Sequence, residues 1–174
     1  MKKIVALVLS LILLCSCSAQ RDDYYVFSFD DFSLVPGYDD VEFMRLVFQM
    51  DTPEKLSAGE KIENIDVIFW DRYFASVDIE NSGKKEIDAT AAKVTRLVYY
   101  IDNYTFSRYA LDGIELSESV KENCEKFNGE YVERNGYACA FGKKVKDKEN
   151  IVILYGDILG IDQDKLDHLE IYVK

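Results

Sequence analysis

The alternation of apolar and polar residues predicts that this chain is built mainly of β-strands. In Ile65–Phe69 and Tyr73–Ile79 every second residue is apolar, which is typical of strands with one buried face. Other segments of strand type are Tyr24–Phe29, Lys85–Ala89, Val94–Ile101, Ile114–Leu116, Tyr131–Arg134, Tyr137–Phe141, Ile151–Tyr155 and Leu169–Val173. The intervening Lys143–Asn150 is rich in charge and is predicted to be a loop.

Two segments instead repeat apolar residues at helical spacing. The first, Asp40–Met50, begins with a good N-cap residue and carries a wide apolar face. The second places Val120, Cys124 and Phe127 on one stripe after an N-cap at Ser117. Both are short, so the sequence predicts small helices that pack on a larger sheet.

Short polar segments mark the turns between these elements. The strongest signal is Asn135-Gly136, since this pair favours the positive φ angles of a tight hairpin. Pro36-Gly37 and Asp112-Gly113 also predict turns, and Asn81–Lys84 predicts a hairpin that leads into Lys85–Ala89.

The elements fall into two runs with the same order: a short strand, a turn, a helix, then three or four strands. The helix starts, Asp40 and Ser117, lie about 77 residues apart. We therefore predict an α+β fold, with two short helices on antiparallel sheet and two diverged tandem repeats at residues 24–110 and 111–174. One continuous α+β domain, in which the shared order is a coincidence, is the alternative.

The N-terminus has a different pattern. Lys2-Lys3 precedes the apolar run Ile4–Leu14, which forms an export signal and is shorter than the roughly 20 residues that cross a membrane. Leu14 lies three places before Cys17, and the small Ser16 directly precedes it. This resembles a bacterial lipoprotein signal, whereas Cys15 follows the bulky Leu14.

The resemblance to lipoprotein signals implies that residues 1–17 are a signal peptide ending at a lipidated Cys17 and that residues 18–23 are a tether. Two or three acyl chains on one cysteine give stable membrane anchoring. The protein is then expected on the extracytoplasmic face of a membrane, either inner or outer. An ordinary secretory signal cleaved near Ala19 is the alternative.

The net charge of the chain is -11 at pH 7. A nucleic-acid partner is therefore not expected, because nucleic-acid affinity comes from basic side chains that neutralise phosphates.

With Cys17 lipidated, Cys124 and Cys139 form one candidate disulfide pair, which an exported compartment permits. Two buried free thiols are the alternative, and the spacing suits neither zinc binding nor a redox motif.

Few residues suggest catalysis. His168 is the single histidine, and no nucleophile motif or phosphate-binding loop accompanies it. The acidic segment Asp157–Asp167 lacks the residue order of a calcium loop and is interpreted as a solvated turn. We therefore predict no catalytic residue, no metal and no cofactor.

Aromatic residues lie on both faces of the central strands. If one face is the core, the other exposes Trp70, Phe74 and Tyr99, and an exposed aromatic cluster marks a protein-binding site. The alternative is that these three side chains pack against a helix or against the second repeat.

The C-terminal third carries a pattern that resembles modules of exported bacterial lipoproteins. The entry to the helix and its ending supply the matching residues, which are Gly113, Ile114, Leu116, Ser117, Val120, Gly129 and Tyr131. In outline these modules are similar to the tandem-repeat fold of beta-lactamase inhibitor proteins and to small outer-membrane assembly lipoproteins. The resemblance implies a non-catalytic binding module with a protein partner. The alternatives are an inhibitor or immunity-like protein that uses the loop Asp157–Asp167, and a hydrolase of envelope glycans.

Overall fold

The computed structural model describes residues 23–29, 32–101, 108–133, 137–145, 148–157, 159–160 and 162–174. The predicted signal peptide with Cys17 and residues 18–22 of the predicted tether lie outside these residues, as does the turn predicted at Asn135-Gly136. In the part of the chain that is described, neither helix is long and apolar enough to cross a membrane.

The main element is an eight-stranded antiparallel sheet with the strand order β11-β12-β13-β14-β8-β6-β5-β3. The first half of the chain contributes β3, β5, β6 and β8, and the second half contributes β11 to β14. The two halves meet where β8 pairs with β14. The strands are β3 (Gln49–Met50), β5 (Lys61–Phe69), β6 (Arg72–Glu80), β8 (Lys93–Tyr100), β11 (Glu130–Glu133), β12 (Tyr137–Val145), β13 (Lys148–Gly156) and β14 (Leu166–Val173).

A four-stranded sheet with the order β10-β9-β1-β2 forms part of a second layer. It consists of two hairpins, one from each half of the chain, joined where β1 pairs with β9. Its strands are β1 (Phe27–Phe29), β2 (Phe32–Leu34), β9 (Tyr109–Leu111) and β10 (Ile114–Glu115). A separate pair joins β4 (Lys55–Leu56) to β7 (Ile87–Asp88), which leads into the 3-10 helix η1 (Ala89–Ala91).

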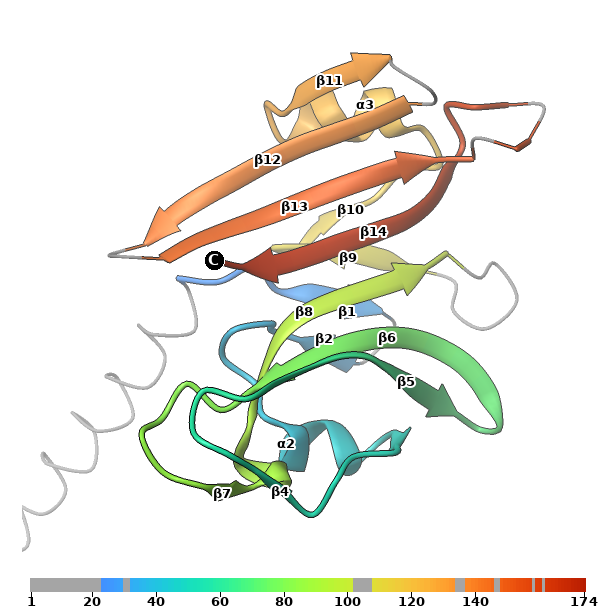
Figure 1. Ribbon diagram of the computed structural model, residues 1–174. Helices are drawn as coiled ribbons and strands as arrows, with labels where there is room; N and C mark the ends of the chain where they lie inside the picture. The colour runs from blue at the N-terminus through green and yellow to red at the C-terminus, as the bar shows by residue number, and fades with distance from the viewer. Residues whose placement is uncertain are drawn as a thin grey trace, which may run out of the picture.

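The small sheet and the helices α2 (Val41–Arg45) and α3 (Val120–Lys126) cover one face of the large sheet. Figure 1 shows the large sheet in front of this second layer, with its other face toward the viewer. The described protein is therefore mostly antiparallel β-structure with two short helices, which agrees with the predicted α+β class in its broad form.

Aromatic side chains fill the space between the two layers. Tyr99 of β8 is 1% exposed, and its ring centroid lies 5.0 Å from that of Phe27 and 5.5 Å from that of Tyr109. Phe74 of β6 lies 4.9 Å from Tyr99 and 4.8 Å from Phe29. Rings from both sheets thus form one continuous core, so the small sheet is held by apolar burial.

The first helix is shorter than the sequence predicts. Asp40 caps α2 as expected, since its Oδ1 accepts a hydrogen bond from the backbone N–H of Phe43 at 3.0 Å. The helix ends at Arg45, and Phe48 packs its ring 4.7 Å from Phe74 in the core. The next two residues, Gln49 and Met50, form the strand β3, because they pair with β5. Tertiary packing therefore overrides the helical spacing after Arg45.

Two predicted connections are also wrong. Lys143–Asn150 is not a loop, because β12 and β13 continue as a paired ladder out to Val145 and Lys148. Asn81–Lys84 does not form a hairpin with β7, since β6 pairs with β8 and β7 pairs with β4. Asn81 instead connects the segment before β5 with the segment before β7. Its Nδ2 donates hydrogen bonds to the carbonyl oxygens of Ser57 and Lys85, both at 2.8 Å. Local charge and turn composition do not reveal such long-range pairing.

Candidate functional site

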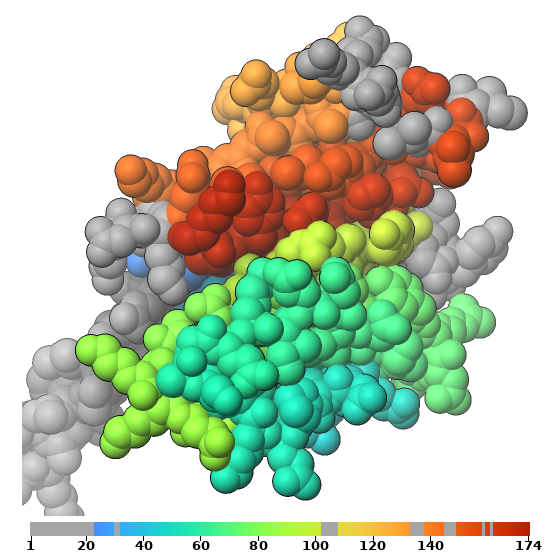
Figure 2. Space-filling model, viewed as in Figure 1, coloured from blue at the N-terminus to red at the C-terminus, as the bar shows by residue number. Residues whose placement is uncertain are grey.

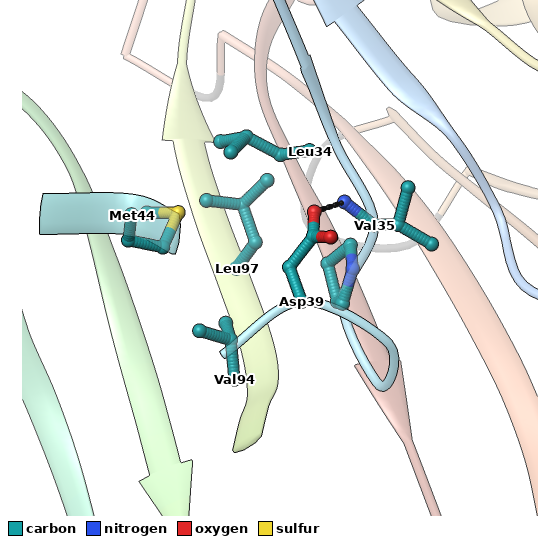
Figure 3. A pocket seen from close by; sticks show the side chains of 7 residues that line it. Leu34, Val35, Asp39, Met44, Val94 and Leu97 are labelled. Carbon is teal, nitrogen blue, oxygen red and sulfur yellow. Dashed lines mark hydrogen bonds between the residues drawn. The ribbon is translucent and has the colours of Figure 1, made fainter. Parts of the chain in front are cut away.

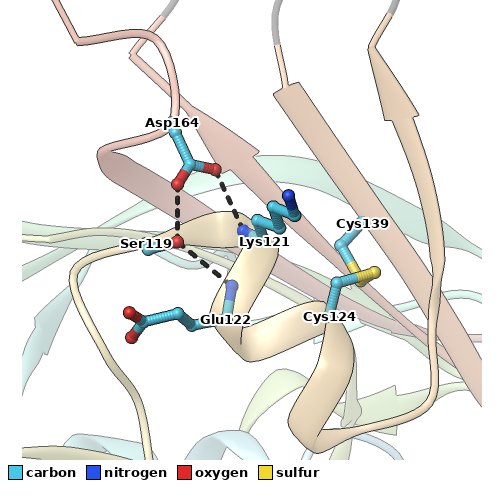
Figure 4. Close-up of a disulfide and its surroundings, with 6 residues drawn as sticks. All are labelled: Ser119, Lys121, Glu122, Cys124, Cys139 and Asp164. Carbon is cyan, nitrogen blue, oxygen red and sulfur yellow. Dashed lines mark hydrogen bonds between the residues drawn. A yellow bond between two sulfur atoms is a disulfide. The ribbon is translucent and has the colours of Figure 1, made fainter.

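Cys124 and Cys139 form a disulfide between α3 and β12 (Figure 4). The structure therefore has the candidate pair bonded rather than as two free thiols. Their Cα atoms lie 5.5 Å apart, and both residues are buried. Gly129 packs directly against this bridge, and a Cβ atom there would lie 2.5 Å from the Cys139 Sγ atom. Because the bridge is enclosed, its role is to fix α3 on the sheet.

The acidic segment Asp157–Asp167 supports the same helix. Asp164 accepts hydrogen bonds from the Ser119 hydroxyl and from the backbone N–H of Lys121, the latter at 3.0 Å (Figure 4). Ser119, rather than the predicted Ser117, is the N-cap of α3, and its Oγ accepts from the N–H of Glu122 at 3.1 Å. Asp164 is therefore a capping residue and not part of a freely solvated turn. Among the described residues, no group of three or more His, Cys, Asp or Glu side chains could hold a metal ion.

One small pocket lies between β2, α2 and β8 (Figure 3). Apolar side chains surround the buried Asp39, whose Oδ2 accepts a hydrogen bond from the N–H of Val35 at 2.7 Å. The pocket leaves no room for a water molecule, so it offers no ligand site. Its lining residues are Leu34, Val35, Pro36, Asp39, Met44, Val94 and Leu97.

His168 belongs to a row of rings on the uncovered face of the large sheet. It stacks on Tyr155 of β13 with 4.4 Å between ring centroids, and it lies 5.0 Å from Tyr100 of β8. Its Nδ1 is 2.7 Å from Asp167 Oδ2. Burial, together with the nearby Glu170 carboxylate, raises the pKa of Tyr155 to about 12, so its hydroxyl stays protonated at neutral pH. His168 is thus packed between aromatic rings rather than freely exposed.

Two of the three aromatic residues predicted for partner binding are buried. Phe74 is 5% exposed and Tyr99 is 1% exposed, so both belong to the core and the predicted exposure is wrong; the alternative holds for Tyr99, which packs against Tyr109 of the second half of the chain. A bulge explains Phe74: Val67 lies opposite Ala75 and Ile68 opposite Tyr73, which leaves Phe74 as an extra residue turned inward. Tyr73 consequently faces outward, and strand alternation likewise places Tyr100 outward when Tyr99 points inward.

Trp70 is the predicted aromatic residue that the structure does place on the surface, with 84% of it exposed. It lies at the tip of the β5–β6 hairpin, where Phe69 pairs with Arg72 and leaves a two-residue turn. Trp70 and Asp71 have φ angles of 48° and 59°, the pattern of a type I′ turn that normally favours Asn-Gly. Positive φ is unfavourable for a bulky residue, so the backbone at Trp70 is strained. This strain costs free energy and leaves the indole ring exposed.

Other apolar side chains surround this tip. The Trp70 ring stacks on Phe69 with 5.0 Å between centroids and 10° between planes. Phe69 in turn lies 6.3 Å from the half-exposed Phe32 and 5.7 Å from Phe48. We call Trp70 with Phe69 and Phe32 the hairpin tip; the ring of Phe69 lies against one side of its indole.

The hairpin tip lies far from the point where the chain enters the domain. The carbonyl oxygen of Asp23, the first described residue, accepts a hydrogen bond from the Nδ2 of Asn150 at 3.1 Å, and Asn150 lies opposite Val173. Figure 1 shows the C-terminus at the left and the β5–β6 turn at the right. The nine residues of β5 span ~30 Å. The hairpin tip and the first described residues therefore lie at opposite ends of the described domain.

Substitution of Trp70 by asparagine is expected to raise the free energy of unfolding by about 1 kcal/mol. The reason is that asparagine tolerates positive φ, whereas tryptophan does not. Chemical denaturation of the two proteins measures the difference. Trp70→Ala is the matched control, because it also removes the ring but has no preference for positive φ. Equal stability of the Asn and Ala variants would contradict the claim that the turn is strained.

Comparison with protein-family models, with curated proteins and with solved structures finds no match to this chain. The candidate site therefore depends on the geometry of the chain itself. The sequence points to Trp70 as an exposed aromatic residue, but the positive φ angles at Trp70 and Asp71 become visible only in the structure.

Proposed function

We propose that this protein is a membrane-anchored extracytoplasmic lipoprotein, lipidated at Cys17, that acts as a non-catalytic binding module for a protein partner. The observation that carries the proposal is Trp70, an 84% exposed indole in a left-handed backbone conformation at a hairpin tip. Strained residues persist where function requires them. Tryptophan is also enriched among the residues that contribute most to protein–protein affinity.

The chemistry of the hairpin tip favours a protein with an apolar recess as its partner. Phe69 stacks against one side of the indole, so the ring is already ordered and loses little entropy on binding. Asp71 and Arg72 flank the ring as exposed polar neighbours, similar to the polar rim around a buried anchor. The acidic chain also argues against a nucleic-acid partner.

Two features support the proposed export of the protein and its attachment to the outer side of a membrane. The buried disulfide between Cys124 and Cys139 is typical of proteins exported to an oxidising compartment. The chain enters the domain at the end opposite Trp70, so a lipid at Cys17 would leave the hairpin tip directed away from the membrane surface. Both features agree with an anchored module that presents its binding residue outward.

We also infer that the chain consists of two diverged repeats, as in the outline of the beta-lactamase inhibitor proteins. The support is topological: a hairpin of the small sheet, a helix and four strands of the large sheet occur in this order in each half. The halves meet at two antiparallel pairs, β8 with β14 and β1 with β9. In this arrangement the β5–β6 turn corresponds to the β12–β13 turn, and Trp70 is specific to the first repeat.

Lipid anchoring is tested at Cys17. We expect Cys17→Ser to release the protein from membranes into the soluble fraction, because the lipidated side chain is lost. Fractionation and mass spectrometry of the mature N-terminus measure this outcome. Cys15→Ser is the matched control and should leave the protein membrane-bound. An unmodified mature end at Gln20 would contradict the proposed anchor.

Partner binding is tested with the full chain in its own membrane, carrying a photoreactive residue in place of Asp71. We expect a cross-linked adduct with a second protein, and we expect Trp70→Asn to reduce its yield more than about tenfold, as for loss of a residue that dominates affinity. Trp70→Asn is expected to stabilise the fold, and thermal denaturation of this variant checks that unfolding does not explain the loss. An adduct with lipid, or a yield that does not depend on Trp70, would contradict the proposal.

A further inference from the structure

The uncovered face of the large sheet differs from the usual solvated face of an antiparallel sheet. Such a face normally carries polar side chains at alternating positions. Here the outward residues of the five strands from β12 to β6 are mostly apolar, aromatic or small (Figure 2 views this face). They include Ala138, Ala140, Gly142, Ile151, Ile153, Tyr155, His168, Tyr172, Val98, Tyr100 and Tyr73.

The strand register aligns these residues in rows across the sheet. In one row Tyr155, His168 and Tyr100 lie directly opposite one another, with Tyr73 6.1 Å beyond Tyr100. The next row contains Ile153, Glu170 and Val98 in register. A row of aromatic rings therefore crosses four strands (β13, β14, β8 and β6), and the next row places the Glu170 carboxylate between two aliphatic residues.

The charges around Arg96, on the β14, β8 and β6 part of this face, are paired with each other. Arg96 Nε lies 2.6 Å from Glu170 Oε1, and Arg96 is also 3.6 Å from the buried Asp78 carboxylate. Lys61 Nζ lies 3.0 Å from the same carboxylate. Covering the part of the face around Arg96, Glu170 and Asp78 would therefore bury charges that are already paired, whereas an unpaired charge is the costly outcome at an interface.

We propose that this face is a homodimer interface, in which the large sheets of two copies of this chain pack face to face about a two-fold axis. The charge distribution permits a second copy as the occupant of this face. The whole chain carries -11, so two copies repel each other over most of their surfaces. The face with paired charges and apolar rows is where this repulsion is least.

The dimensions of the face fit a stable dimer. Nine residues of β13 span ~30 Å, and five strands at their usual spacing span ~24 Å, which gives a footprint of ~700 Å². A standard interface buries ~800 Å² per partner. Sheets that pack face to face bury such alternate side chains between them, and a two-fold axis lets one surface serve both copies.

The dimer is tested with the full chain in its own membrane, carrying a photoreactive residue in place of Ile153 at the centre of the face. We expect an adduct of twice the chain mass that contains only this protein by mass spectrometry. The matched control replaces Ile114, an exposed isoleucine of the second layer, and should give no such adduct. Equal self-adducts at both positions, an adduct with another protein, or no adduct would each overturn the proposal.

A charge placed on the face gives a second test. With the photoreactive residue kept in place of Ile153, we expect Ile151→Lys to lower the yield of the self-adduct more than about tenfold, since a two-fold interface would bury two unpaired ammonium groups. Thermal denaturation checks that the variant is folded, and an unchanged yield would overturn the proposal. Trp70→Asn should leave this adduct intact, so a failure of the dimer is distinguishable from a failure of the proposed tip function.

Discussion

Tyr99→Ala is expected to lower the free energy of unfolding by about 4 kcal/mol, as is usual when a large aromatic side chain is removed from a core. Tyr99 is 1% exposed and joins the two sheets, since its ring contacts Phe27 from the small sheet and Phe74 from the large one. Its removal leaves a cavity where the two layers meet. Urea denaturation followed by circular dichroism measures the loss.

The neighbouring Tyr100 provides the matched control. It is the same residue type on the same strand, but it points to the opposite face and is 47% exposed. We expect Tyr100→Ala to cost the monomer less than about 1 kcal/mol, because surface substitutions seldom cost more. Equal losses for the two variants would show that Tyr99 is not a core residue.

Removal of the disulfide is expected to have the second largest effect on stability, a loss of about 3 kcal/mol, because a closed loop of about 15 residues restricts the unfolded chain by that amount. The bond joins residues 15 positions apart and connects α3 to β12. The double variant Cys124→Ala with Cys139→Ala retains small apolar side chains at both buried positions. Denaturant titration of the natural and variant proteins measures the difference.

A reducing agent provides the control for this prediction. The natural protein should lose similar stability when it is unfolded in the presence of dithiothreitol, because its unfolded chain is then no longer cross-linked. The double variant should not respond to the reagent. A natural protein that is equally stable with and without dithiothreitol at equilibrium would contradict a stabilising bond between Cys124 and Cys139.

Much of the fold can be predicted from local patterns. Alternating apolar residues identify Ile65–Phe69, Tyr73–Ile79 and Val94–Ile101 as strand segments, and the structure confirms all three. The first strand begins four residues earlier than predicted, and the other two shift by one residue at their ends. The N-cap at Asp40 is confirmed as well. These predictions succeed because strand pleating and helix capping depend on residues close together in the sequence.

The candidate site is less predictable. Trp70 is identified as an exposed aromatic residue, but Phe74 and Tyr99 are buried, and the residues that replace them on the surface are their neighbours Tyr73 and Tyr100. A bulge between β5 and β6 shifts the alternation by one residue at Phe74. A bulge of this kind is set by pairing between strands, so the pattern within one strand does not reveal it.

The sequence by itself determined the acidic charge, most of the strands and the helix start at Asp40, and it offered Cys124 and Cys139 as a candidate pair. The tertiary structure decided which face of each strand is buried, where α2 ends and that Asp164 caps α3. It also placed Trp70 in a left-handed turn at the end of the molecule opposite the chain entry. The physical reason is that these features depend on contacts between residues far apart in the chain, whose apolar burial outweighs local preference.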